Sequence, residues 1–81
     1  MVTARGTSMY PTIKNGDTLL INTNIPSGNL TGAILVFGQE ERICHRCMLD
    51  GGSWLTFKGD NRNSTESCSR DELVAIFVTV L

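Results

Sequence analysis

The chain has 81 residues, of which 41% are hydrophobic and 19% charged, and its formal net charge at pH 7 is −1. This length allows one small domain with a thin core, and the composition is typical of a globular protein rather than a disordered one. Charge is also balanced along the chain, at −1 for residues 1–41 and zero for residues 42–81. We therefore expect a single domain over residues 1–81 and no nucleic-acid partner, because binding nucleic acid or anionic lipid needs clustered Lys and Arg.

Short β-type segments alternate with turn signals along the chain, and no window has a convincing helical period. The turn Asn15-Gly16-Asp17 precedes the first expected strand, a loop over residues 24–31 follows it, and Asp50-Gly51-Gly52 predicts a hairpin further on. Residues 59–70 are polar, and we predict no regular structure for them. The expected strands are residues 18–22, 33–37, 42–49, 54–58 and 73–81. The pattern predicts a mostly β fold, a small, partly open antiparallel β-barrel of five or six strands.

The sequence has no stretch near the roughly 20 apolar residues that span a bilayer, and residues 1–6 lack the apolar region of a signal peptide. We expect the chain as given to be soluble, as a cytoplasmic protein or as the soluble domain of a membrane-anchored one. Membrane association would then need a segment outside this sequence. The odd number of cysteines (Cys44, Cys47 and Cys68) fits a reducing compartment better than a disulfide scaffold.

The first polar segment of interest is Gly6-Thr7-Ser8-Met9-Tyr10-Pro11-Thr12, which Gly16-Asp17 follows. A serine hydroxyl becomes a strong nucleophile only when a base removes its proton and nearby donors hold the oxyanion. Ser8 lies between the flexible Gly6 and the rigid Pro11, an arrangement that can fix a tight bend with the serine N–H free. Taken alone, however, the segment is better explained as an ordinary turn.

His45 is the only histidine, and it lies in the segment Ile43-Cys44-His45-Arg46-Cys47. Imidazole groups ordinarily titrate near pH 6.5, so a histidine can accept a proton at neutral pH. On a strand, His45 and Cys47 would share one face, with Cys44 and Arg46 on the other. The opposite orientation of the two thiols, and the lack of a fourth ligand, argue against a zinc site. A half-buried structural histidine is the simpler interpretation of this segment alone.

The third segment is a polar turn, Lys58-Gly59-Asp60-Asn61-Arg62-Asn63-Ser64-Thr65-Glu66-Ser67. Its two carboxylates, Asp60 and Glu66, are of the kind that can orient an imidazole and stabilise its cation. A solvated loop is the simpler alternative. The order and spacing of the three segments within one short chain carry more information than any segment by itself.

Together the three segments resemble the signal peptidase family of serine proteases, over most of residues 6–80. Residues 6–12 with Gly16-Asp17 are similar to the nucleophile box of that family, in which Ser-Met-x-Pro leads to Gly-Asp. Residues 43–46 resemble its general-base strand, and Lys58-Gly59-Asp60-Asn61 resembles its third box. Bacterial signal peptidases have a lysine at the position of His45, whereas archaeal and endoplasmic-reticulum types have a histidine. The resemblance is therefore to the histidine branch, and the related LexA-like repressors share the serine box.

The resemblance implies a serine endopeptidase that cleaves an extended signal or leader peptide, with a mostly antiparallel β fold and no cofactor or metal. It implies Ser8 as the nucleophile and His45 as the general base. Gly6 and Met9 would belong to the part of the site that binds the oxyanion and the substrate.

The resemblance leaves the third catalytic group open. In the histidine branch the acid lies six residues after the Asp of Gly-Asp-Asn, a position that Glu66 fills here. Because the family has an aspartate there, Asp60, Glu66 and Asp71 are all candidates for orienting His45, in that order. If Glu66 takes this role, Asp60 becomes a supporting residue of the site.

Three features depart from the family pattern. Gly32-Ala33 stands where the family has a second Gly-Asp, no membrane anchor precedes Ser8, and the large inserted domain of many bacterial members is missing. The main alternative is a LexA-like self-cleaving or non-catalytic regulatory module that dimerises. Against it, those proteins have a lysine at the position of His45, and the sequence has no helix-turn-helix segment. Residues 75–81 could form an edge strand that pairs with a second copy, so a homodimer is compatible with the sequence.

Overall fold

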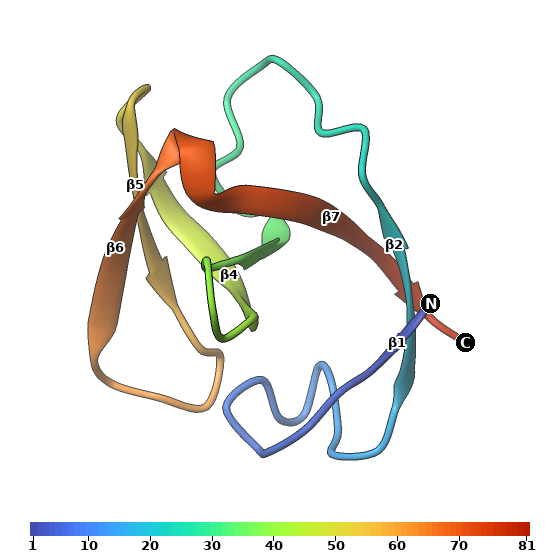
Figure 1. Cartoon of the computed structure of the whole chain (residues 1–81). Helices are drawn as coiled ribbons and strands as arrows, with labels where there is room; N and C mark the ends of the chain where they lie inside the picture. The colour runs from blue at the N-terminus through green and yellow to red at the C-terminus, as the bar shows by residue number, and fades with distance from the viewer.

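A computed structural model describes all residues from Met1 to Leu81. The fold is mostly β, with antiparallel strands in one sheet, one turn of 3-10 helix and no α-helix (Figure 1). None of its helical structure has the length and apolar character needed to cross a membrane. The elements, in chain order, are β1 (Val2–Thr3), β2 (Thr18–Asn22), β3 (Ile34–Phe37), β4 (Ile43–Asp50), β5 (Trp54–Lys58), β6 (Thr65–Ser69), the 3-10 helix η1 (Arg70–Glu72) and β7 (Leu73–Val80).

The seven strands are ordered β1-β2-β7-β3-β4-β5-β6 in the sheet. The C-terminal strand β7 is therefore internal and pairs with both β2 and β3. The edge strands β1 and β6 do not pair with each other, so the sheet is open. The sheet is nevertheless strongly curved, and Figure 1 shows the loop after β1 approaching the loop between β5 and β6. This approach brings segments that are distant in the sequence to one place.

Strand β3 explains how so short a chain forms a core. All four of its residues are buried, because the curved sheet covers both of its faces. Leu35 and Phe37 point into the larger hydrophobic cluster, whereas Ile34 points into a smaller one. The larger cluster consists of Leu30, Leu35, Phe37, Cys47, Leu55, Phe57 and Cys68, and the smaller one of Met9, Ile13, Leu19 and Ile34.

The sequence-based strands at residues 18–22 and 54–58 have the bounds observed for β2 and β5. The expected strands at residues 33–37 and 73–81 are each one residue longer than β3 and β7, and the expected strand at residues 42–49 is shifted by one residue from β4. The expected number of strands was too low, because β1 and β6 were missed. The prediction of no regular structure is wrong for Thr65–Ser69, whose residues are polar because β6 is an edge strand with only Cys68 fully buried. Its backbone pairing with β5, rather than any local hydrophobic pattern, makes it a strand.

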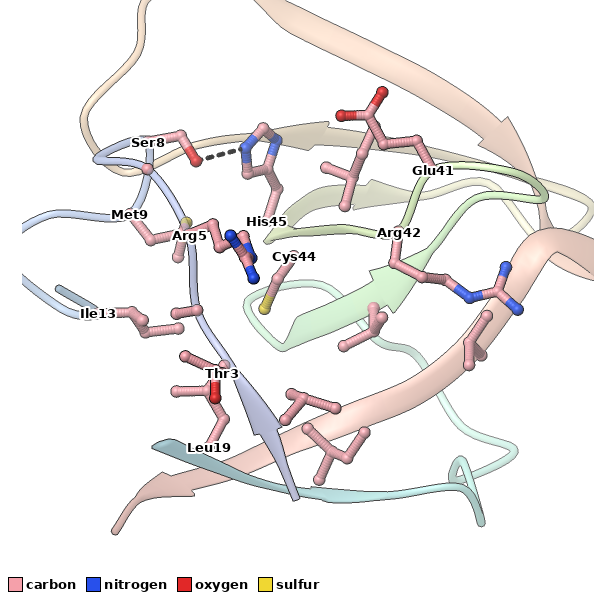
Figure 2. Close-up of a pocket in the computed structure, with 17 residues that line it drawn as sticks. Thr3, Arg5, Ser8, Met9, Ile13, Leu19, Glu41, Arg42, Cys44 and His45 are labelled. Atoms are coloured by element: carbon pink, nitrogen blue, oxygen red, sulfur yellow. Dashed lines mark hydrogen bonds between the residues drawn. The ribbon is translucent and has the colours of Figure 1, made fainter. Parts of the chain in front are cut away.

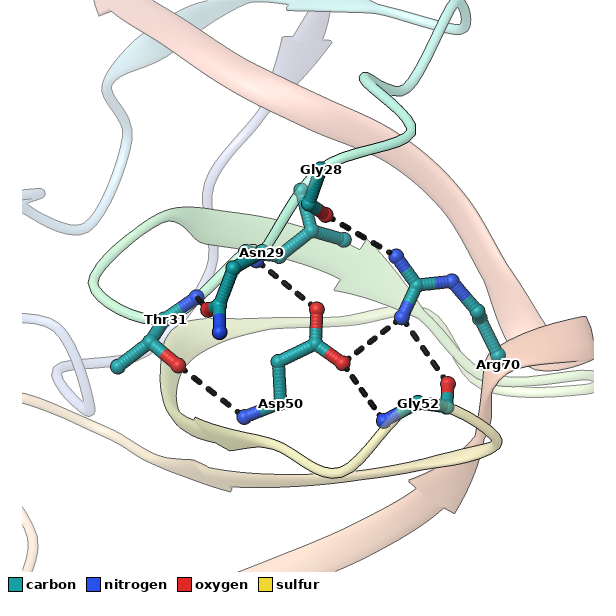
Figure 3. Close-up of polar contacts among 7 residues, drawn as sticks. Gly28, Asn29, Thr31, Asp50, Gly52 and Arg70 are labelled. Carbon is teal, nitrogen blue, oxygen red and sulfur yellow. Dashed lines mark hydrogen bonds and ion pairs between the residues drawn. The ribbon is translucent and has the colours of Figure 1, made fainter.

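The end of the molecule away from β1 is held by a partly buried ion pair between Asp50 and Arg70 (Figure 3). Asp50 Oδ2 accepts a hydrogen bond from the N–H of Leu30, and Asp50 Oδ1 accepts one from the N–H of Gly52. These backbone donors, followed by the Arg70 guanidinium, lower the pKa of Asp50. Arg70 also donates to the carbonyls of Gly28 and Gly52. The pair therefore fixes the loop over residues 24–31 against the β4–β5 hairpin.

Candidate active site

Ser8 lies in the loop between β1 and β2, on a turn held from both sides. Met9 and Ile13 are buried in the smaller cluster and anchor the turn, and the N–H of Ile13 donates to the carbonyl of Met9 at 2.9 Å. Before Ser8, Gly6 has a φ of +83°, a conformation that favours glycine, and its N–H donates to Asn15 Oδ1 at 2.8 Å. Gly6 therefore shapes the turn, and its own N–H is already occupied.

The backbone N–H groups of Ser8 and Met9 make no hydrogen bond within the chain. They are therefore free to donate to an external acceptor. The carbonyl of Ser8 is engaged instead, because it accepts a hydrogen bond of 2.8 Å from the N–H of Asn61. Of the residues predicted for oxyanion and substrate binding, Met9 thus retains a free donor and Gly6 does not.

His45 lies on β4, directly opposite Leu35 of β3. The alternation along β4 places it on the same face as the buried Cys47, and its ring makes an edge contact with Phe37 at a centroid distance of 6.4 Å. At this margin of the larger cluster, His45 Nε2 lies 2.9 Å from Ser8 Oγ (Figure 2). The structure therefore brings together two side chains that are 37 positions apart in the sequence.

Glu66 completes a line of three side chains. It lies on β6 opposite Phe57, so it projects from the sheet face that also carries His45. Glu66 Oε1 accepts a hydrogen bond from His45 Nδ1. With Nδ1 donating to this carboxylate, Nε2 is the nitrogen left to accept the proton of the Ser8 hydroxyl. Among the three carboxylates considered from the sequence, Glu66 contacts His45, whereas Asp60 and Asp71 do not.

Asp60 holds the two loops together rather than orienting the histidine. Its carboxylate accepts hydrogen bonds from Arg46 Nε at 2.9 Å, from Arg46 Nη2 at 2.8 Å and from the Thr12 hydroxyl at 2.6 Å. The bonds from Arg46 are the largest cause of the low pKa of Asp60, which is about 2. Arg46 also donates to the carbonyl of Gly32 at 2.9 Å. The side chains of Arg46 and Thr12 had no assigned role from sequence, because their partner is distant along the chain.

This network predicts a specific loss of stability in acid. The folded-state pKa of Asp60 lies below its ordinary value of 3.8, so its contribution is present above about pH 4 and is lost as the pH falls toward 2. We expect the free energy of unfolding of the wild type to exceed that of Asp60→Asn by about 1 to 2 kcal/mol at pH 5. The difference is modest because solvent partly screens the carboxylate. Urea titrations at pH 5, 3 and 2 measure this difference.

The difference between the wild type and Asp60→Asn should shrink as the pH falls through this range. Asp71→Asn is the matched control, because Asp71 forms no ion pair. The pKa of Asp50 is also lowered, but Asp50 is common to all three proteins, so it does not affect the comparison. A difference that stays constant from pH 5 to pH 2 would contradict this role of Asp60.

Gly59 lies where the β1–β2 loop meets the β5–β6 loop, and a side chain there would collide with neighbouring atoms. A Cβ atom at this position would lie 2.5 Å from the carbonyl oxygen of Ser8 and 3.2 Å from His45 Nε2. The third box of the sequence contains Gly59, but only the structure gives this physical reason for it. The absence of a side chain at Gly59 therefore allows Ser8 and His45 to approach each other.

A cavity of about 640 Å³ opens beside Ser8 and His45 (Figure 2). Its walls come mainly from β1, the Ser8 loop and the first half of β4, and they are largely apolar. Cys44 also lines this cavity, and burial raises the pKa of its thiol to about 11. The thiol is therefore protonated at neutral pH and is not an activated nucleophile beside Ser8. The apolar lining residues are Val2, Ala4, Met9, Ile13, Leu19, Ile21, Val36, Ile43, Cys44 and Val74.

The cysteines are all unpaired, and they do not gather into a metal site. Cys47 belongs to the larger hydrophobic cluster, whereas Cys44 packs against the smaller one. The two thiols therefore lie on opposite faces of β4, as the strand periodicity predicts. No group of three or more His, Cys, Asp or Glu side chains is placed to hold a metal ion.

No family model, no curated protein and no solved structure matches this chain.

Proposed function

We propose that the protein is a serine endopeptidase similar to the histidine branch of the signal peptidase family. The observation that carries the proposal is the continuous line from Ser8 Oγ through His45 to Glu66 Oε1, with 2.9 Å between Ser8 Oγ and His45 Nε2. A hydroxyl, an imidazole and a carboxylate in this order form the arrangement that activates a serine for acyl transfer. The proposal includes the finer fold description, in which the curved open sheet is a small, partly open β-barrel.

In the proposed reaction, Ser8 Oγ attacks the carbonyl carbon of the scissile peptide bond while His45 Nε2 takes the hydroxyl proton. The free N–H of Ser8 donates to the oxyanion of the tetrahedral intermediate. His45 then protonates the leaving amine, and the C–N bond breaks to leave an ester on Ser8. A water molecule, deprotonated by His45, hydrolyses the ester and regenerates the serine. Glu66 holds the ring and stabilises the imidazolium during both steps.

Two features support an extended peptide as the substrate. The cavity beside Ser8 is apolar and is bordered by strand residues, which suits side chains that alternate along an extended chain. In addition, β5 pairs with β4 only from Arg46 onward, so the backbone of residues 43–45 is unpaired on that side. An extended peptide could bind there by adding a strand to this edge. Signal or leader peptides are the substrate class that the family resemblance favours.

Covalent trapping of Ser8 tests the proposal directly. A fluorophosphonate probe reacts with an activated serine hydroxyl, because phosphorus accepts the serine oxygen as fluoride leaves. We expect one adduct per chain, located on Ser8 by peptide mass spectrometry, and no adduct on Ser8→Ala. A wild-type protein that stays unlabelled while it is folded, or that is labelled equally in Ser8→Ala, would contradict the proposal.

Incubation with leader-like peptides then distinguishes a protease from a LexA-like self-cleaving module. Cleavage of added peptides by the wild type, and not by Ser8→Ala, supports a protease that acts in trans. Fragments that arise only from the protein's own chain, at a rate independent of concentration, would support self-cleavage instead.

A further inference from the structure

Arg5 is a cation at the edge of the candidate active site that forms no ion pair within the chain. It lines the same cavity as Ser8 and His45, and Figure 2 shows its side chain over this cavity. The three ion pairs of the structure are His45–Glu66, Arg46–Asp60 and Arg70–Asp50, so Arg5 belongs to none of them. Its guanidinium also donates no hydrogen bond to the rest of the chain, so all five of its N–H groups are available.

The backbone holds Arg5 in place on both sides. The N–H of Ala4 donates to the carbonyl of Asp17, and the carbonyl of Ala4 accepts from the N–H of Gly16, both at 2.8 Å. On the other side, the N–H of Gly6 donates to Asn15 Oδ1. Arg5 therefore starts from a fixed backbone position three residues before the candidate nucleophile.

No other charged group that lines the cavity forms an ion pair with Arg5. Arg42 donates to the carbonyls of Gly38 and Gln39 in its own loop, so its guanidinium is engaged. Glu41 also lines the cavity, but it forms no ion pair with Arg5. Most of the remaining lining is apolar. A guanidinium free of internal partners, above an apolar surface, favours a carboxylate ligand, which it can bind with two parallel hydrogen bonds.

We propose that Arg5 binds a carboxylate group of the substrate close to the scissile bond. This inference rests on the proposed function, because it assigns the Ser8 cavity to the substrate. The carboxylate comes either from an Asp or Glu side chain or from the free C-terminus of the peptide. The site would thus favour an extended, mainly apolar peptide that has one negative charge near the cleavage point.

Peptide binding to the Ser8→Ala variant tests this inference without any need for turnover. The probes are fluorescent peptides of Ala and Val with an amidated C-terminus, in which a single Asp, or the matched Asn, is moved through successive positions. A second set without Asp has a free or an amidated C-terminus. We expect the Asp peptide at one position, or the free-acid peptide, to bind about three- to tenfold more tightly than its uncharged match. Which set shows the preference identifies the source of the carboxylate.

A second substitution attributes the preference to Arg5. Arg5→Gln in the Ser8→Ala background should abolish the preference while leaving the affinity for uncharged peptides unchanged. Lys14→Gln is the matched control, because Lys14 is a nearby exposed cation that does not line the cavity. Equal binding of charged and uncharged peptides, equal losses from Arg5→Gln and Lys14→Gln, or no binding of any acidic peptide would overturn the inference.

The outcome is separable from that of the proposed function. Labelling of Ser8 by the probe without any preference for a carboxylate overturns the role of Arg5 and leaves the proposed function standing. A carboxylate preference that depends on Arg5, in a protein whose Ser8 is never labelled, supports the binding site and contradicts the proposed catalysis.

Discussion

Replacing His45 by alanine is expected to slow the labelling of Ser8 by the fluorophosphonate probe about 100- to 10,000-fold, because in the proposed mechanism the imidazole is the base that takes the hydroxyl proton. His45 Nε2 is 2.9 Å from Ser8 Oγ. The carboxylate of Glu66 contacts the other ring nitrogen, Nδ1, rather than the Ser8 hydroxyl. The second-order rate constant for labelling, measured at pH 7.5 by intact-protein mass spectrometry, gives the size of the effect.

Two controls separate the loss of a base from the loss of structure. His45 packs against Phe37, so the alanine variant loses a ring from the margin of the core, and its fold is checked by thermal unfolding. His45→Gln restores much of the side-chain volume but supplies no base, so it should be labelled as slowly as the alanine variant. Added imidazole should partly restore the labelling of His45→Ala but not of His45→Gln. Labelling of a folded His45→Ala protein at the wild-type rate would show that the proposed mechanism is wrong.

The strands that were predicted well are those in which the pattern of polar and apolar residues matches the pattern of exposed and buried side chains. Trp54 to Lys58 alternates between exposed and buried residues, and Ile34 to Phe37 is apolar throughout, so local patterns suffice for both. Strand β6 lies at a sheet edge and has only one fully buried side chain. Its pattern of polar residues therefore resembles that of a polar loop. Backbone pairing with β5 decides its structure, and no local pattern reports that pairing.

The same difference explains which parts of the site could be predicted. Ser8 and His45 were identifiable because few residue types can act as a nucleophile and a neutral-pH base. The roles of Asp60 and Glu66 were not separable, because a carboxylate in a polar turn can point in several directions. The pairing of Glu66 with Phe57 fixes its orientation toward His45, whereas Arg46 and Thr12 engage Asp60. The choice therefore depends on strand register and on distant partners.

Gly59→Ala is expected to have the second large effect, through steric displacement rather than through loss of a chemical group. The new Cβ atom would lie 2.5 Å from the carbonyl oxygen of Ser8, a contact that requires backbone movement. Since that carbonyl accepts a hydrogen bond from the N–H of Asn61, movement also weakens the contact between the two loops. We expect the labelling of Ser8 to fall about 100-fold, because a displacement of roughly 1 Å is enough to misalign reacting groups.

The same substitution should lower the free energy of unfolding by about 1 to 3 kcal/mol, as overpacking typically does. Gly28→Ala is the matched control, because Gly28 has no atom within 4 Å of a new Cβ and no positive φ, so it should retain both stability and labelling. Labelling rates are divided by the folded fraction, measured by circular dichroism at the same temperature, which separates misalignment from unfolding. If Gly59→Ala reacts at the wild-type rate per folded molecule, the close approach at Gly59 does not control the geometry of Ser8 and His45. If it reacts slowly while folded, Gly59 is a positioning residue whose missing side chain lets Ser8 and His45 approach each other.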